Sequence, residues 1–421
     1  MRRKILFALA AGGLLVAGLA VAAYVKITDK PSTGLDTDLV GVSVSTAEGQ
    51  AAELTTTSAR DAGGKKKQLR ERCWPTYGGN PQRTLALPDV HLGKPKRAVW
   101  ARGMRDLIEL PPAFCDGRLY VNLERGRSVA VDARSGRKLW TWRAGGKLVS
   151  SPAIAGPRLI VASTDGVVTA LRRANGRPLW SVRTGGPVES SPVVIDETAY
   201  FGSLDGRLFA VDVGTGRVRW AYDTGSEIKG AASVWGERVC VANYGGAITC
   251  LRRTNGRKLW ATYVKRDALR YESFYATPST DGARVYTAAR TGRVVALSGA
   301  TGHTVWTANM GALAYATPAI AHGRIFVGAF DGFLRSYRAR DGALLWSRSV
   351  AGKVIAPALV VGDLVFVSTL EGRTFGLRAG DGKIVWRIRA GAYAPGIATN
   401  RRYYFSLNGL LLAFRGERGP R

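Results

Sequence analysis

The chain of 421 residues has few of the side chains that metal and redox chemistry require: three histidines, four cysteines and three methionines. These numbers exclude a rich metal site, and four cysteines are too few for a disulfide-framework protein. Acidic residues are also scarce, 31 against 61 lysines and arginines, so the formal net charge is +30. Because 46% of the residues are apolar, the composition excludes a chain that is disordered throughout.

The first 26 residues have the pattern of a membrane segment. A basic head, residues 1–4, precedes the run 5–25, which is 21 residues long and carries no charge. A run of this length spans a bilayer as a helix, and the basic head stays on the cytoplasmic side. We therefore predict a signal-anchor over residues 1–26, with the rest of the chain on the extracytoplasmic side of the cell membrane. A cleavable secretion signal is the alternative, because Ala20-Val21-Ala22 is a small-x-small site.

Residues 27–70 differ in composition from everything after them. They are rich in Thr, Ser, Gly, Ala and Asp and contain no aromatic residue. Such a segment cannot bury enough apolar surface to order itself, so we predict a flexible linker. The alternating stretch 40–44 leaves room for one stray strand.

A tryptophan series organises the remainder of the chain. Successive members are separated by 40, 40, 40, 40, 46, 40 and 40 residues. Within each interval, four short β-rich runs are divided by turn dipeptides such as Asp165-Gly166 and Asn175-Gly176. Four strands in about 40 residues are typical of a β-propeller blade. The series consists of Trp100, Trp140, Trp180, Trp220, Trp260, Trp306, Trp346 and Trp386.

The number of blades follows from the two ends of the series. Eight tryptophans delimit seven complete units. The run 97–100 is an orphan outer strand, and residues 389–415 supply about three further strands without a closing tryptophan. Joined, these ends make an eighth blade and remove the open sheet edges. We predict an all-β, eight-bladed β-propeller of four-stranded blades over residues 71–421.

Two eleven-residue units carry a resemblance to a known family. The segments 130–140 (AVDARSGRKLW) and 210–220 (AVDVGTGRVRW) resemble the tryptophan-docking motif of the quinoprotein, or PQQ-like, propeller family. Looser copies end at the other tryptophans from 180 onward, and the resemblance covers about residues 95–415. It implies that the tryptophans of the series are structural and fill the wedges between blades.

The family has two branches, and this sequence departs from one of them. Quinoprotein dehydrogenases bind pyrroloquinoline quinone (PQQ) and Ca²⁺, with an adjacent Cys-Cys disulfide and acidic and amide metal ligands. The non-enzymatic branch includes the propeller lipoprotein of the outer-membrane β-barrel assembly machine. This chain has no adjacent cysteine pair, and its regular units leave little loop length for a catalytic pocket. We expect a non-enzyme of the second type, with no catalytic, cofactor-binding or metal-binding residues.

The four cysteines suggest two disulfides. Cys240 and Cys250 flank a hairpin centred on Gly245, which sets them opposite each other. A buried free pair is the alternative. Cys73 precedes the propeller and Cys115 lies early in the first blade, so a bridge between them would staple the linker to the ring.

Two sets of residues are candidates for contact with a ligand or partner. The six extra residues between Trp260 and Trp306 lie within 265–275, where aromatic and charged side chains are dense; a tolerated insertion is the alternative. A second set lies three residues before the Ser-Pro or Thr-Pro step of the inner strands, near the expected channel mouth, where structural filling of the channel is the alternative. The candidates are Glu109, Glu189, Lys229, Arg270, Tyr271, Tyr275 and Tyr315.

The sequence favours a monomeric, membrane-tethered propeller that acts as a scaffold or recognition module for envelope proteins or a cell-wall polymer. Residues 71–421 carry a net charge of +26. This charge indicates either a solvated surface or affinity for a polyanion such as anionic lipid or a cell-wall phosphopolymer. Nucleic acid is disfavoured, because the chain is expected outside the cytoplasm and shows no stacking platform. The alternatives are a sensor of a cell-wall glycan or small ligand at the channel mouth, and a PQQ- and Ca²⁺-dependent quinoprotein oxidoreductase.

Overall fold

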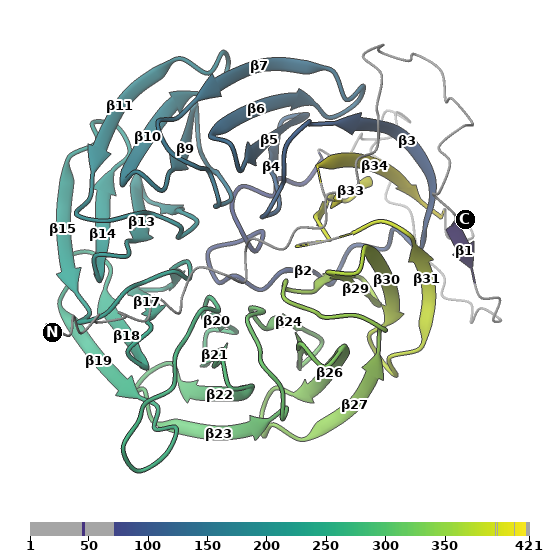
Figure 1. Cartoon of the computed structure of the whole chain (residues 1–421). Helices are drawn as coiled ribbons and strands as arrows, with labels where there is room; N and C mark the ends of the chain where they lie inside the picture. The colour runs from purple at the N-terminus through teal and green to yellow at the C-terminus, as the bar shows by residue number, and fades with distance from the viewer. Residues whose placement is uncertain (1–43, 47–70, 392, 394, 408, 418–421) are drawn as a thin grey trace, which may run out of the picture. The chain divides into compact units, whose positions relative to one another are not determined.

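The computed structural model describes residues 44–46, 71–391, 393, 395–407 and 409–417. Within them, eight antiparallel blades of four strands follow one another around a ring (Figure 1). The predicted all-β, eight-bladed propeller is therefore confirmed. The expected signal-anchor over residues 1–26 and all of the linker except 44–46 lie outside the described residues. The described part contains no helix that is long and apolar enough to cross a membrane.

Blades 1 to 4 each run from the innermost strand to the outermost. Blade 1 contains β4 (Ala113–Cys115), β5 (Arg118–Leu123), β6 (Arg127–Asp132) and β7 (Lys138–Arg143). Blade 2 contains β8 (Ala153–Ala155), β9 (Arg158–Ala162), β10 (Val167–Arg172) and β11 (Pro178–Arg183). Blade 3 contains β12 (Val193–Ile195), β13 (Thr198–Gly202), β14 (Arg207–Asp212) and β15 (Val218–Asp223). Blade 4 contains β16 (Ser233–Trp235), β17 (Arg238–Ala242), β18 (Ala247–Arg252) and β19 (Lys258–Tyr263).

Blades 5 to 7 keep this order. Blade 5 contains β20 (Ser279–Thr280), β21 (Arg284–Ala288), β22 (Arg293–Ser298) and β23 (Thr304–Asn309). Blade 6 contains β24 (Ala319–Ala321), β25 (Arg324–Gly328), β26 (Phe333–Arg338) and β27 (Leu344–Ser349). Blade 7 contains β28 (Leu359–Val361), β29 (Leu364–Thr369), β30 (Arg373–Arg378) and β31 (Ile384–Ile388), with β1 (Val44–Thr46) paired to the outer edge of β31 and β2 (Ala86–Leu87) parallel to β28.

Blade 8 combines the two ends of the domain, as the sequence predicted. Its outer strand, β3 (Pro95–Gly103), pairs with β34 (Leu410–Gly416), which continues to β33 (Arg402–Leu407) and β32 (Ile397–Ala398). The contact is antiparallel, and Trp100 lies opposite Ala413. Because β3 precedes blade 1 and the other three strands follow blade 7, this pairing closes the ring and leaves no strand edge between first and last blade.

The burial pattern explains why the inner and outer strands differ in sequence. The middle strands, such as β9 and β10, are buried along almost their whole length, because neighbouring blades cover both faces. The outermost strand of the same blade, β11, alternates between exposed and half-buried positions. The tight turn after β9 places Gly166 at φ +79°, a left-handed conformation that glycine adopts without steric cost.

Seven of the series tryptophans bridge from the outer strand of one blade to the next blade. In blade 3, the indole nitrogen of Trp220 donates to the carbonyl oxygen of Arg253 in blade 4 at 3.1 Å. The ring lies on Gly256, which has φ +72° and would bring a Cβ within 2.8 Å of the indole. The eighth, Trp386, is buried instead at the closing seam, among Phe405 and Phe414 of blade 8. Each interface thus joins a flat ring to a turn that only glycine fits.

Both predicted disulfides are confirmed. Cys240 and Cys250 are bonded and lie directly opposite each other on β17 and β18. Cys73 is bonded to Cys115 at the end of β4. The second bridge fixes the segment that precedes the ring to blade 1, as the spacing suggested.

The segment 71–92 does not belong to any blade but lies along the axis of the ring (Figure 1). We call it the axial segment. Its backbone meets the inner strands of blades 1, 2, 4, 5, 6 and 7 in turn, through hydrogen bonds to Phe114, Ile154, Val234, Thr280, Ile320 and Val360. Side-chain hydrogen bonds extend these contacts to blades 3 and 8. One stretch of about 20 residues therefore touches all eight blades.

Arg83 is the centre of the axial segment and is fully buried. Its Nε donates to the carbonyl oxygen of Ala232 at 2.8 Å, and its Nη2 donates to that of Ser191 at 3.0 Å. Burial lowers the pKa of Arg83 from 12.5 to about 9, and desolvation raises that of Tyr77 beside it to about 12. The guanidinium is thus held by neutral oxygens from blades 3 and 4 and from its own segment.

Candidate functional site

Two faces of the ring follow from the antiparallel strand order. One face carries the connections from the outermost strand of each blade to the innermost strand of the next, and we call it the crossover face. The opposite face, the hairpin face, carries the turns between the first and second and between the third and fourth strands of each blade. The axial segment begins beside Cys115 and meets Gly362 near its end, both at turns of the hairpin face. It closes the axis from that side, so the open end of the axis is on the crossover face.

The candidate residues near the channel mouth lie together around the axis on the crossover face. Glu189 and Lys229, at equivalent positions before blades 3 and 4, form an ion pair. Glu109, before blade 1, lies near both of them, since its titration responds to their charges. The rings of Tyr275 and Tyr315, before blades 5 and 6, meet edge to face at 5.1 Å. We call these five side chains the axial ring.

Glu109 is the most perturbed acid of the axial ring. Burial raises its pKa from 4.5 to about 7. Among the nearby charges, Lys229 has the largest influence and lowers the pKa, while Glu189 and Glu124 raise it. At neutral pH this carboxyl group is therefore divided between a protonated form that donates a hydrogen bond and an ionised form that accepts.

Two aromatic residues that sequence reasoning missed extend the ring on one side. Tyr244 lies 4.4 Å from Tyr275, measured between ring centroids, and Phe330 lies 5.2 Å from Tyr315. Both occupy the position two residues before the glycine of the hairpin between the second and third strands. That shared repeat position is the signal that could have identified them. Blades 4 to 6 thus present an aromatic surface next to the charged side formed by blades 1, 3 and 4.

The six extra residues of blade 4 form a hairpin, residues 264–272, that leaves the ring beyond β19 (Figure 1). An isolated bridge joins Lys265 to Tyr271, and the backbone nitrogen of Arg266 donates to the carbonyl oxygen of Arg270 at 2.8 Å. The Asp267 carboxylate accepts from the backbone nitrogens of Leu269 and Arg270. These bonds fix the turn in one conformation.

The base of the hairpin is held by a buried acid. Glu272 is 2% exposed; its Oε2 accepts from the hydroxyl of Thr291 at 2.8 Å, and its Oε1 lies 3.3 Å from Nε of Arg293. The same arginine donates from Nη1 to the carbonyl oxygen of Lys265 at 2.7 Å. Blade 5 thus braces both strands of the hairpin.

The structure separates the candidates from 265–275 into two groups. Tyr275 belongs to the axial ring, whereas Tyr271 packs against Tyr263 of β19 at 5.4 Å. The Arg270 guanidinium is bound to Asp267 within the hairpin. The most exposed side chain is Leu269 at the tip, 93% exposed, which the sequence analysis did not single out. An apolar side chain at this position has no structural role in the fold.

The described residues provide little for a metal ion. Their one cluster of three potential ligands combines Asp116 with Cys73 and Cys115. Since the two sulfur atoms are bonded to each other, they offer no thiolate to a metal. The chemistry available at the axial ring is hydrogen bonding by Glu109, ion pairing, and stacking on tyrosine.

A family model covers most of the propeller. The model is described as outer membrane protein assembly factor BamB and matches residues 93–269, 246–395 and 330–420. The comparison with curated proteins gives no match.

Several solved structures share the fold. BamB from Moraxella catarrhalis is 22% identical over 65% of this chain and 81% of that chain, with a TM-score of 0.52. A quinohemoprotein alcohol dehydrogenase from Comamonas testosteroni is 15% identical over 83% of this chain and 82% of its own, with a TM-score of 0.67. A europium-containing methanol dehydrogenase is 14% identical over 80% and 88%, with a TM-score of 0.68. At these identities the structures show a common fold.

Proposed function

The chain belongs to the propeller family described as outer membrane protein assembly factor BamB, and from this premise we propose that it is a non-catalytic protein-binding scaffold at the cell envelope. The observation that carries the proposal is Leu269, which is 93% exposed at the tip of the hairpin 264–272. Because internal hydrogen bonds and Arg293 already order this hairpin, little conformational entropy is lost when a partner covers it. Such a preformed apolar tip suits insertion into a partner's pocket.

The charges around the tip define the partner further. Lys265 and Arg266 are exposed, whereas the two acids of the hairpin, Asp267 and Glu272, are paired with Arg270 and Arg293. The free charge beside Leu269 is therefore positive. We infer a partner protein with an apolar pocket and an acidic rim.

A photo-crosslinking residue at position 269 tests this proposal in the native cell. We expect one protein to be captured in stoichiometric amount, and we expect Leu269→Asp to weaken its binding by more than tenfold without changing the thermal midpoint. Position 217, an exposed turn residue of blade 3, is the matched control and should capture nothing specific. Equal capture at both positions, or recovery of the propeller alone, would remove the hairpin from the interface.

We propose that the propeller is exported and tethered to the membrane by residues 1–26. The basic head and the uncharged run support this anchor. The two disulfides support an oxidising compartment, since cytosolic thiols are kept reduced. Added protease should digest the propeller in spheroplasts whose cytoplasmic membrane is intact, and protection of the propeller there would contradict export.

The axial ring supports a second candidate function, the binding of a cell-wall glycan or small ligand. Tyrosine faces stack on sugar rings, and Glu109 and Glu189 supply hydrogen-bonding carboxyl groups next to them. Calorimetry with cell-wall glycan fragments tests it: we expect Glu189→Gln, Lys229→Met and Tyr275→Leu each to abolish binding while the protein stays folded. Retained affinity in all three variants would exclude the axial ring as the site.

The dehydrogenase neighbours raise a third candidate, a quinoprotein oxidoreductase, and the residues present do not fit its donor set. The family's enzymes have a disulfide between adjacent cysteines, whereas Cys73, Cys115, Cys240 and Cys250 form two bridges between distant positions. We therefore derive no redox step for this chain.

A further inference from the structure

The hairpin face carries a cavity between blades 1 and 2 that is lined mainly by arginine. Its volume is about 500–600 Å³, large enough for a small organic ligand. One carboxylate and one large apolar side chain complete the lining. The residues that determine its chemistry are Asp116, Arg118, Arg158, Arg172, Arg173 and Leu179.

Two of the four arginines have no counter-charge. Arg158 at the start of β9 lies directly opposite Arg172 at the end of β10, an arrangement of like charges that destabilises a strand pair. Neither guanidinium forms a hydrogen bond or ion pair with another residue in the described part of the chain, and the Nε atom of Arg158 is buried without a partner. The pair therefore presents two positive charges with unused hydrogen-bond donors.

The other two arginines are already committed. Arg173 forms an ion pair with Asp116 at 2.6 Å, and Arg118 donates to the carbonyl oxygen of Ala174. The single carboxylate of the cavity is thus consumed by one arginine. Arg158 and Arg172 remain for a ligand.

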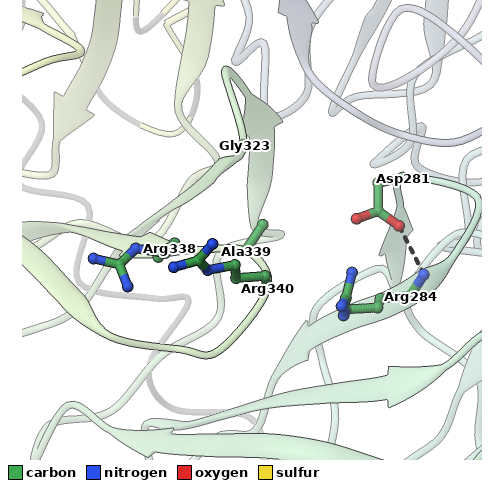
Figure 2. A pocket seen from close by; sticks show the side chains of 6 residues that line it. All are labelled: Asp281, Arg284, Gly323, Arg338, Ala339 and Arg340. Atoms are coloured by element: carbon green, nitrogen blue, oxygen red, sulfur yellow. Dashed lines mark hydrogen bonds between the residues drawn. The ribbon is translucent and has the colours of Figure 1, made fainter.

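A related cavity between blades 5 and 6 shows what a neutralised version looks like. It is lined by Arg284, Arg338 and Arg340 together with Asp281, and Figure 2 shows the carboxylate of Asp281 bonded to the backbone nitrogen of Arg284. Here Arg338 and Arg340 both bind the adjacent Asp341, at 2.9 and 3.3 Å. Blade 2 has no acid at the corresponding turn, where Asn175 follows Arg172, Arg173 and Ala174.

We propose that the cavity between blades 1 and 2 binds a phosphate ester through Arg158 and Arg172. A guanidinium fork matches phosphate oxygens in bidentate geometry, and a phosphate monoester carries close to the two negative charges that the pair lacks. Leu179, which is 41% exposed on the rim, offers apolar contact for the organic part of the ligand. The site is separate from the hairpin 264–272 and does not depend on the scaffold function.

Calorimetry at low ionic strength with glycerol 3-phosphate and inorganic pyrophosphate tests the proposal on the full chain. We expect Arg158→Gln/Arg172→Gln to weaken binding at least tenfold. The matched control, Arg217→Gln/Arg257→Gln, removes the same two charges from exposed turns and should change affinity less than twofold. No binding by the unaltered protein, or an equal loss in both variants, would overturn the site.

Vesicles distinguish the source of the phosphate. Binding of glycerol 3-phosphate with no added affinity for phosphatidylglycerol vesicles over neutral vesicles indicates a soluble phosphate ester. Affinity for phosphatidylglycerol vesicles that the double variant loses and the control retains indicates a lipid headgroup. Both results support the site, and vesicle binding that both variants lose equally contradicts it.

Thermal unfolding separates a binding role from a structural one. Without ligand, the double variant should melt at a temperature equal to or higher than that of the unaltered protein, because it removes a repulsive pair. Pyrophosphate should raise the midpoint of the unaltered protein and not that of the double variant. A lower midpoint for the ligand-free variant would show that the two arginines serve the fold.

Discussion

The blade interfaces and the axial segment hold the same ring together in opposite ways. Each regular interface repeats one local contact, such as Trp220 on Gly256, and involves only two neighbouring blades. The axial segment, residues 71–92, occurs once and bonds to all eight blades. Repetition thus supplies the architecture, and an unrepeated segment ties its parts to one another.

This difference extends to the surfaces that recognise other molecules. The hairpin 264–272 occurs in one blade, and the aromatic half of the axial ring occurs in three. The uncompensated pair Arg158 and Arg172 likewise depends on the absence of an acid that blade 6 possesses. Positions where one blade differs from the others are therefore where specific binding is expected.

The largest expected effect comes from emptying the centre of the axial segment. Arg83→Ala leaves the oxygens of Ala232 and Ser191 without donors and opens a cavity, so we expect the free energy of unfolding to fall by about 4 kcal/mol. Trp220→Ala removes a half-exposed ring from one interface and should cost about 2 kcal/mol. Urea unfolding measures both.

Arg83→Lys is the matched control, since it keeps the charge but loses the fork of donors. Its stability should fall between those of the unaltered protein and Arg83→Ala. If Trp220→Ala proves more damaging than Arg83→Ala, the axial segment is only a filler and the comparison fails.

A smaller effect distinguishes the charged positions of the axial ring from their apolar equivalent, Val149. The folded protein keeps the Glu109 proton up to a pKa of about 7, whereas the unfolded chain releases it near 4.5. The folded state therefore binds more protons between these values, and the free energy of unfolding falls as pH rises from 4.5 through 7, by about 2 kcal/mol. Melting scans at pH 5 and pH 8 should show this slope.

Glu109→Gln should flatten that pH dependence and leave the protein at least as stable at pH 8. Glu237→Gln, an exposed acid at a turn of the hairpin face, should leave the slope unchanged. An unchanged slope in the Glu109 variant would mean that another group of the cluster, which includes Glu124, Glu189, Lys147 and Lys229, takes up the proton.

The smallest effect compares the two disulfides. Cys73–Cys115 closes a separation of 42 residues and joins the axial segment to a blade, whereas Cys240–Cys250 closes 10 residues within one blade. Loop-closure entropy predicts that removing the first costs about 1 kcal/mol more than removing the second. Paired serine variants, compared by urea unfolding, give this difference directly. An equal or smaller loss from the first pair would show that the axial segment stays in place without its bridge.

The repeated features could be predicted from the sequence, since a period of 40 residues is visible without structure. The blade number, the closure by both ends, the family and both disulfides followed from spacing, and the structure and the family match confirm them. The mixed character of Glu109, Glu189, Lys229, Tyr275 and Tyr315 followed from aligning the repeats. Their grouping around the axis agrees with that alignment, and their role in binding stays a prediction.

The axial segment could not be predicted, because it has no period and no continuous hydrophobic pattern. Its fully buried charged residue, Arg83, would be placed at a surface by any composition rule. Its contacts reach from Phe114 to Val360 and exist only after the ring has formed. Leu269 was missed for a similar reason, because exposure at a hairpin tip depends on how the inserted residues fold.

The shared eighth blade sets a schedule for the growing chain. Strand β3 is made about 300 residues before its partner β34, an interval of about 15–60 s at ordinary rates of synthesis. Throughout that time β3 and the open side of blade 7 remain free to pair with other chains. A chain interrupted before residue 410 never acquires the missing strand, and so becomes a substrate for envelope proteases and aggregation rather than a smaller propeller.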